Sequence, residues 1–136
     1  MNNIVKSTRL FEEGLGRRLK IVEADLAKKH REMALAPFRF LRGTFYPWAE
    51  VFPLVCEDLM DAPLVFGVGD LHIENYGTWR DCEGRLIWGI NDFDEGCELP
   101  YTNDLVRLAA SARLAVDDGN LRISKEDYRR DINRLM

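Results

Sequence analysis

Helical hydrophobic spacing at both ends of the chain, with short apolar segments between them, restricts this sequence to an α+β fold. Residues 8–33 carry apolar side chains at steps of three and four, the stripe of one amphipathic helix. Pro37 ends that helix, because the residue before a proline avoids the helical region. The same spacing predicts a second helix over residues 102–116, and Ser124 begins a capping-box pattern that opens a third.

Aromatic residues and prolines fill the segment that follows the first helix, residues 37–55. Prolines at three positions in this segment exclude any long element. We predict a short strand over residues 38–41, a turn at Gly43 and a short helix that begins at about Pro47.

The centre of the chain consists of strand and turn patterns. Residues 64–69, with the sequence LVFGVG, form a short apolar run next to glycine, which is typical of a buried strand. Residues 76–80 and 85–90 flank the acidic, glycine-ended segment 81–84, which predicts a β-hairpin with glycine closing the turn. The predicted fold is therefore α+β, with a small hairpin sheet between an N-terminal amphipathic helix and two C-terminal helices.

The 136 residues suffice for one domain, since about 150 residues per domain is usual. We divide this single domain into an N-terminal helix at 1–35, strands and acidic loops at 36–100, and helices at 101–136. The last helical pattern is still running at Met136. We therefore expect the domain to be partial and to be completed by a missing C-terminal segment or by a second copy of the chain.

The distribution of charge excludes several partners. Residues 43–104 contain 13 Asp and Glu but only 2 Lys and Arg, whereas both ends of the chain are net positive. An acidic centre repels nucleic acid and suits hard divalent cations, although a solvated acidic surface is the alternative for most of the glutamates. The sequence has no apolar run of the ~18 residues that a membrane span needs. Its three cysteines lack C-x-x-C spacing, so we expect a cytoplasmic protein that binds neither nucleic acid nor membrane.

Polar residues that suit phosphoryl transfer gather in two loops, residues 69–75 and 91–95, each directly after a predicted apolar strand. Asp70 and Asn75 have the spacing of the kinase catalytic loop, where the Asp receives the proton of the substrate hydroxyl and the Asn binds a metal. The predicted hairpin then returns the chain to Asp92, at the point where kinases carry a metal-binding Asp. Each pattern alone is common, but their order favours a kinase-like site.

Four motifs in order carry a resemblance to known proteins. The sequence GDLHIENYG at 69–77 resembles the catalytic loop of aminoglycoside-phosphotransferase-like kinases. Together with residues 37–43, 91–95 and 104–111, it resembles a bacterial family of uncharacterised proteins, domain of unknown function 2252, over residues 33–130. The resemblance implies a kinase-like catalytic-lobe fragment, a Mg²⁺-dependent phosphotransferase. It also implies Mg²⁺ and ATP as cofactors and a small-molecule hydroxyl or amine as the acceptor.

The resemblance also assigns roles to residues of the two loops. Asp70 matches the catalytic Asp, and Asn75 and Asp92 match the two magnesium ligands. His72 matches the loop histidine of the catalytic set, where ordering the loop by a hydrogen bond fits it better than acting as a base. A satisfied, partly buried histidine is the alternative for it. Asp94 is either a further metal ligand or a backbone cap.

Two further residues lie outside these loops. Asp104 falls where related kinases place an Asp that hydrogen-bonds the backbone of the catalytic loop, and it is also a first-turn Asp that the helix dipole favours. Arg42 is expected either to grip a phosphate of the cofactor or to form a buried salt bridge with a carboxylate of the acidic centre. We further expect the helix over 102–116 to pack an apolar face under the catalytic loop, formed by Leu105, Leu108, Ala109 and Ala112.

Two other functions remain open. The sequence shows no glycine-rich phosphate loop and no strand lysine, so a non-catalytic or truncated kinase-like module is the first alternative. A metal-dependent phosphoesterase is the second, because Asp70 and His72 have the spacing that opens such metal sites. That alternative needs more histidines, and the chain has one other, His30, in the N-terminal helical region.

Overall fold

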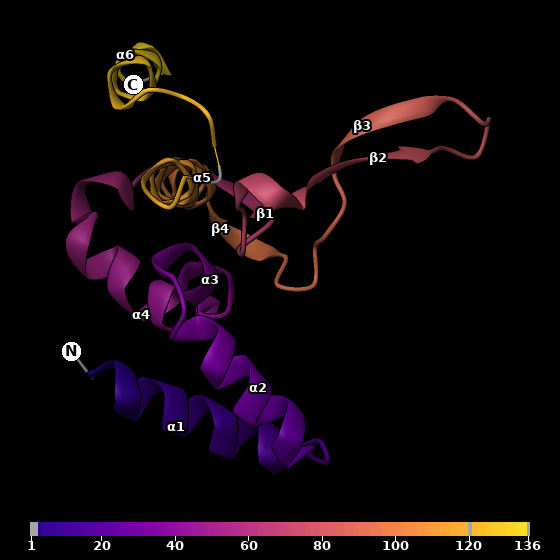
Figure 1. Cartoon of the computed structure of the whole chain (residues 1–136), viewed down its shortest axis with the longest axis vertical. Helices are drawn as coiled ribbons and strands as arrows, with labels where there is room; N and C mark the ends of the chain where they lie inside the picture. The colour runs from indigo at the N-terminus through magenta and orange to yellow at the C-terminus, as the bar shows by residue number, and fades with distance from the viewer. Residues whose placement is uncertain (1–2, 120, 136) are drawn as a thin grey trace. The chain divides into compact units, whose positions relative to one another are not determined.

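The computed structural model describes residues 3–119 and 121–135, and it has the α+β composition that the sequence predicts. The chain divides into two compact units, Met1–Met60 and Asp61–Met136, which we describe separately (Figure 1). Within the described residues, no helix is both long enough and apolar enough to cross a membrane.

Unit 1 is helical. Its elements are α1 (Ile4–Gly16), α2 (Glu23–Met33), α3 (Pro37–Arg42), α4 (Phe45–Val55) and the short 3₁₀ helix η1 (Glu57–Leu59). The prediction of one helix over 8–33 is wrong, because the chain leaves the helical conformation after Gly16. Two glycines in the last turn of α1 weaken the helix there, since glycine costs about 1 kcal/mol relative to alanine in a helix.

The break after α1 lets side chains of α1 contact α4. The ring of Phe11 stacks on Tyr46 with centroids 4.2 Å apart, and Thr8 and Tyr46 share a hydrogen bond of 2.9 Å. The buried hydroxyl of Ser7 donates to a carboxylate oxygen of Glu50 at 2.6 Å. One continuous helix over 8–33 would have kept the following helices away from these contacts.

The strand predicted over 38–41 is also wrong, because these residues form α3. Pro37 occupies the first turn of this helix, where its missing N–H and fixed φ are favourable. Phe38 and Leu41 are buried three residues apart, which is helical spacing. The apolar residues of this run are spaced both two and three positions apart, so the sequence is consistent with a strand or a helix. Burial of the pair that lies three apart favours the helix.

Unit 2 carries all four strands of the described residues. Its elements in chain order are β1 (Leu64–Gly67), η2 (Ile73–Asn75), β2 (Tyr76–Arg80), β3 (Leu86–Ile90), β4 (Cys97–Pro100), α5 (Tyr101–Asp117) and α6 (Lys125–Leu135). The predicted hairpin is confirmed, since β2 pairs with β3 antiparallel in a register that sets Tyr76 opposite Ile90. The strand β4, which the sequence did not suggest, pairs antiparallel with β1.

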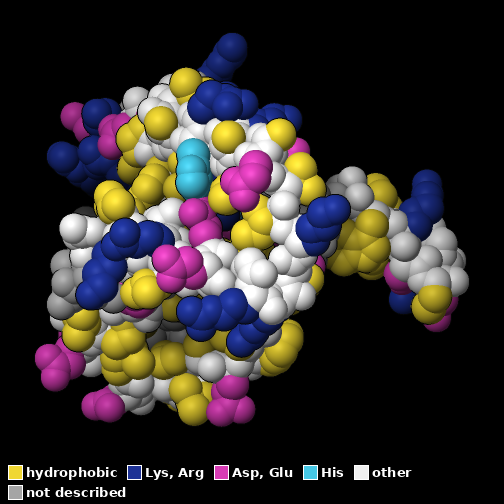
Figure 2. Space-filling model, turned by 90° about the horizontal axis from the view of Figure 1, so that it is seen from below, with side chains coloured by type: hydrophobic (Ala, Val, Ile, Leu, Met, Phe, Trp, Pro, Cys, Tyr) yellow, Lys and Arg dark blue, Asp and Glu magenta, His cyan; other side chains and the backbone are white. Residues whose placement is uncertain are grey.

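The strand predicted at 64–69 is shorter and less buried than expected. It ends at Gly67, and its first three residues are exposed, Phe66 to 72%. In the described residues β1 pairs with β4 alone, so its other edge has no strand partner. The β2–β3 hairpin also exposes hydrophobic side chains, which Figure 2 shows at the right of the view. Its most exposed large apolar residues are Leu86 and Trp88.

The helix α5 lies beside β1, β4 and η2 (Figure 1), but its buried face is polar. The predicted apolar face is wrong: Leu105 is 55% exposed, and Leu108 is only half-buried. The fully or nearly buried side chains are instead Asn103, Asp104, Arg107, Ser111, Ala115 and Val116. The reason lies in the loop beside α5, whose backbone N–H groups need hydrogen-bond partners that leucine cannot supply.

Candidate active site

The loop that follows β1 turns sharply at Gly69, whose φ of 77° lies in the left-handed region. Only glycine adopts this conformation at little cost, because a Cβ would clash with the backbone. Val68, directly before Gly69, and Leu71, directly after Asp70, are buried. The turn therefore anchors the loop on both sides while it presents Asp70 between them.

We expect Gly69→Ala to destabilise the protein by about 1–2 kcal/mol, because alanine carries the left-handed penalty there. Gly14→Ala is the matched control, since a Cβ at Gly14 in α1 meets nothing within 4 Å. That change should stabilise by up to about 1 kcal/mol. Denaturant unfolding of both variants measures the difference, and equal effects would contradict the assigned strain at Gly69.

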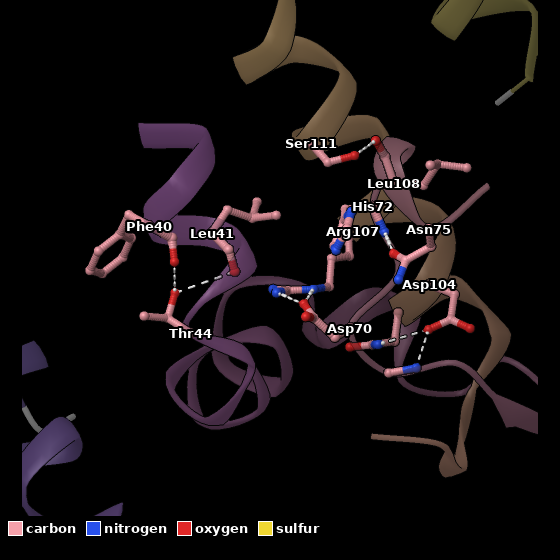
Figure 3. A network of polar contacts seen from close by, with 12 residues as sticks. Phe40, Leu41, Thr44, Asp70, His72, Asn75, Asp104, Arg107, Leu108 and Ser111 are labelled. Carbon is pink, nitrogen blue, oxygen red and sulfur yellow. Dashed lines mark hydrogen bonds and ion pairs between the residues drawn. The ribbon is translucent and has the colours of Figure 1, made fainter. Parts of the chain in front are cut away.

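Asp104 holds the backbone of this loop from the first turn of α5 (Figure 3). Its carboxylate accepts hydrogen bonds from the N–H groups of Val68 at 2.7 Å and Gly69 at 3.1 Å. The approach is close, because a Cβ added at Gly67 would lie 3.0 Å from the same carboxylate. The N-terminus of α5 also favours a negative charge at this position. Asp104 thus has both the backbone contact and the helix position that the sequence suggested.

Arg107 is the residue that sequence reasoning missed. It lies one turn after Asp104 on α5, its side chain is 1% exposed, and its Nε donates to Oδ1 of Asp70 at 3.0 Å. A terminal guanidinium nitrogen of Arg107 donates to the same Oδ1 (Figure 3). The available signal was an arginine at helical spacing from Asp104 in an otherwise apolar stretch, but the spacing alone does not name its partner.

Burial governs the ionisation of this pair. Burial raises the pKa of the Asp70 carboxyl, the guanidinium of Arg107 opposes that rise, and the carboxylates of Glu95 and Asp92 add to it. Burial also lowers the pKa of Arg107, and Asp70 opposes that shift. Removing the positive charge of Arg107 would therefore push the pKa of Asp70 further upward.

The turn η2 places Asn75 by hydrogen bonds with His72. The N–H of His72 donates to Oδ1 of Asn75 at 2.6 Å, and the N–H of Asn75 donates to the carbonyl of His72 at 3.0 Å. Both residues are buried. The backbone carbonyl of Asn75 also accepts the N–H of Asn91 at 3.0 Å, which ties this loop to the second acidic loop.

Ser111 supplies a third contact from α5 to the loop. Its hydroxyl oxygen accepts the N–H of Ile73 at 3.1 Å. The hydroxyl donates to the carbonyl of Leu108 at 2.7 Å (Figure 3). Asp104, Arg107 and Ser111 therefore form one polar face of α5, which contacts the loop near its start, at Asp70 and near its end. We call these three residues the α5 polar face.

The second acidic loop lies across a pocket from the first. Asp92 and Asp94 are exposed, and the N–H of Asp94 donates to Oδ1 of Asp92 at 3.2 Å. A pocket of about 200 Å³ is lined by Val68, Asp70, Asn75, Asp92, Asp94 and Glu95. The structure thus brings four of the predicted site residues to one place and adds Glu95, whose charge the sequence could not position.

The other predicted site residues lie elsewhere. His72 and Asp104 are buried and do not line this pocket; their contacts support the loop from behind. Arg42 belongs to unit 1, where it forms the last residue of α3. The pocket as described in unit 2 therefore has carboxylates and an amide but no lining Lys or Arg.

Residues 18–136 match the bacterial protein family described as "Uncharacterized protein conserved in bacteria (DUF2252)". The chain belongs to this family. The four DUF2252-like motifs noted in the sequence all fall within the matched residues, and three of them supply the loops and α5 of this site. No curated protein and no solved structure matches the chain significantly.

The donor atoms of this DUF2252 pocket fit Mg²⁺ only in part. In the portion of the chain that the structure describes, no group of three or more His, Cys, Asp or Glu side chains is arranged to hold a metal ion. Asp92 and Asn75 nevertheless line one pocket, and their side-chain oxygens are hard donors, although Oδ1 of the buried Asn75 already accepts the N–H of His72. Mg²⁺ is commonly held by one or two protein ligands, with phosphate oxygens and water filling the other positions. The donor set therefore fits a magnesium ion that arrives with a phosphate.

Proposed function

We propose that this chain is the catalytic segment of a Mg²⁺-dependent phosphotransferase that acts on a small-molecule hydroxyl or amine, and that this pocket is its catalytic site. The observation that carries the proposal is that Asp70, Asn75 and Asp92 line one pocket of unit 2. These are the residue types, in the chain order, that kinase-like phosphoryl transfer uses.

Asp70 would orient the acceptor group and receive its proton. Its position at the pocket supports this role, and its raised pKa brings the carboxylate closer to the range where it accepts a proton well. Asn75 and Asp92 would hold the magnesium ion, which neutralises negative charge on the transferred phosphate. Burial of the loop and the α5 polar face would keep the proton acceptor fixed relative to these ligands.

The pocket fits a phosphate group better than a whole nucleotide. Its volume of about 200 Å³ is below the about 300–1,000 Å³ of usual small-molecule sites. None of its lining residues is a cation that could pair with a triphosphate. We therefore propose that the rest of an ATP molecule is bound by another segment of the protein or by a second copy of the chain.

A non-catalytic kinase-like module is the second candidate, and two observations favour it. Asp70 is already paired with a buried arginine, and the described residues hold no three-residue metal cluster. Nothing in the pocket favours a metal-dependent phosphoesterase, because its lining residues include no histidine. The other histidine, His30, pairs with Glu12 in unit 1.

An assay of the full-length protein with Mg²⁺ and ATP labelled in the γ-phosphate tests the proposal. We expect transfer of the label to at least one member of a panel of small alcohols and amines, and loss of transfer on chelation of Mg²⁺. A folded protein that neither binds Mg²⁺–ATP in calorimetry nor transfers phosphate would establish the non-catalytic module. Hydrolysis of a phosphomonoester without transfer would instead establish the phosphoesterase.

A further inference from the structure

Arg107 contacts Asp70, the loop side chain that would accept the proton in the proposed reaction. Two of its guanidinium nitrogens, Nε and a terminal one, donate to the same oxygen, Oδ1 of Asp70. The Arg107 side chain is 1% exposed, whereas the Asp70 side chain is 23% exposed and lines the pocket. The ion pair thus connects the interior of unit 2 to the surface of the pocket.

The loop backbone has its own supports on both sides of this contact. Asp104 accepts the N–H groups of Val68 and Gly69, and Ser111 accepts the N–H of Ile73. These hydrogen bonds hold the path of the chain before and after Asp70. They leave the rotation of the Asp70 side chain undetermined, and Arg107 acts on that rotation.

A buried arginine is costly unless its charge is paired and its donors are satisfied. A structural role in α5 alone could be filled by an apolar side chain of similar volume at lower cost. The charge of Arg107 lies against the carboxylate of Asp70, which lines the pocket, and this placement points to a role at the pocket.

We propose that Arg107 is a positioning residue that holds the carboxylate of Asp70 in one orientation at the pocket. The inference rests on the proposed phosphotransferase, since it assigns the orientation a role in accepting the proton of the acceptor group. By binding Oδ1 from the interior with two donors, Arg107 keeps the Asp70 side chain from moving to its other χ1 rotamers.

Lysine cannot reproduce this arrangement fully. A guanidinium presents several N–H donors in a rigid plane, whereas an ammonium is a point charge on a flexible stem. Arg107→Lys therefore keeps a positive charge near Asp70 with looser geometry, and Arg107→Met removes the charge while keeping much of the volume. The two variants separate charge from orientation.

The test compares kcat, KM and Mg²⁺–ATP affinity of both variants in the full-length protein. We expect Arg107→Met to lower kcat by about 100-fold, the usual effect of a misplaced reacting group, with KM and Mg²⁺–ATP affinity changed by less than about 3-fold. Arg107→Lys should have an intermediate kcat, about a tenth of that of the unchanged protein. The matched controls Arg113→Met and Arg113→Lys change the partly exposed arginine that pairs with Asp117 on the same helix, and both should leave kcat unchanged.

A kcat of Arg107→Met within about 3-fold of the Arg113→Met value would overturn the inference while leaving the proposed function intact. Equal loss of kcat and of Mg²⁺–ATP affinity would also overturn it, because it would indicate general damage to the site. If Arg107→Met does not fold, the kcat of Arg107→Lys decides, and a value equal to that of the unchanged protein overturns the inference. If the unchanged protein transfers no phosphate, the proposed function fails and the positioning role fails with it.

Discussion

Asp92→Asn is expected to abolish Mg²⁺-dependent phosphoryl transfer by the full-length protein. The change removes one negative charge from the pocket where Asp92 and Asn75 would hold the ion. The neutral amide that replaces the Asp92 carboxylate is a weaker ligand for Mg²⁺. Because the ion neutralises the phosphates during transfer, we expect a loss of at least about 1,000-fold in kcat/KM. The rate of label transfer from γ-labelled ATP measures it, with Mg²⁺ varied to show whether high concentrations restore activity.

Asp58→Asn is the matched control for this change. Asp58 is an exposed carboxylate of η1 in unit 1, so the same chemical substitution is made at a residue that does not line the pocket. It should leave both transfer and Mg²⁺–ATP affinity unchanged. Retention of full activity by Asp92→Asn would refute the assignment of Asp92 as a metal ligand.

Asp70→Asn should behave differently from Asp92→Asn. If Asp70 accepts the proton of the acceptor group, its loss lowers turnover while Mg²⁺–ATP still binds. The structure adds that this variant leaves the buried charge of Arg107 without its carboxylate partner, which destabilises the fold. The comparison of turnover is therefore made at a temperature where circular dichroism shows both variants folded.

Local signals account for the parts of the fold that the sequence predicted. The hairpin was predictable because two short strand-forming segments flank an acidic turn that ends in Gly84, whose φ of 78° favours glycine. The start of α6 was predictable because the hydroxyl of Ser124 accepts the N–H of Asp127, a contact between near neighbours in the chain. Both features depend on residues only a few positions apart.

The errors arose where distant contacts chose between local alternatives. Residues 38–41 fit a strand or a helix, and the burial of Phe38 and Leu41 on one side selected the helix. The strand β4 has no strong pattern of its own and exists through its pairing with β1. The apolar residues of α5 kept helical spacing, but the neighbouring loop required the polar face of that helix instead.

The same division holds for the candidate site. Asp70, Asn75 and Asp92 could be named from spacing because short segments after strands place them. Glu95 and Arg107 could not, because their positions at or beneath the pocket depend on how the second loop and α5 pack against the first loop. A charge buried by tertiary structure looks, in sequence, like any other charge on a helix.

Asp104→Ala is expected to destabilise the protein by about 2–6 kcal/mol. The change removes the acceptor of two backbone N–H groups, those of the buried residues Val68 and Gly69. Each buried donor left without a partner costs about 1–3 kcal/mol. Denaturant unfolding measures the total, and Asp58→Ala, at an exposed position, should change stability by no more than about 0.5 kcal/mol.

Hydrogen exchange then shows where the stability is lost. If Asp104 holds the start of the loop that follows β1, the amides of Val68 and Gly69 should exchange much faster in Asp104→Ala. The amides of the β2–β3 hairpin should keep their rates relative to global unfolding, because that hairpin has its own ladder of hydrogen bonds. A loss below about 1 kcal/mol with unchanged exchange at both amides would mean that water replaces the carboxylate. In that case Arg107 would position the side chain of Asp70, and Ser111 would hold the end of the loop, without help from Asp104.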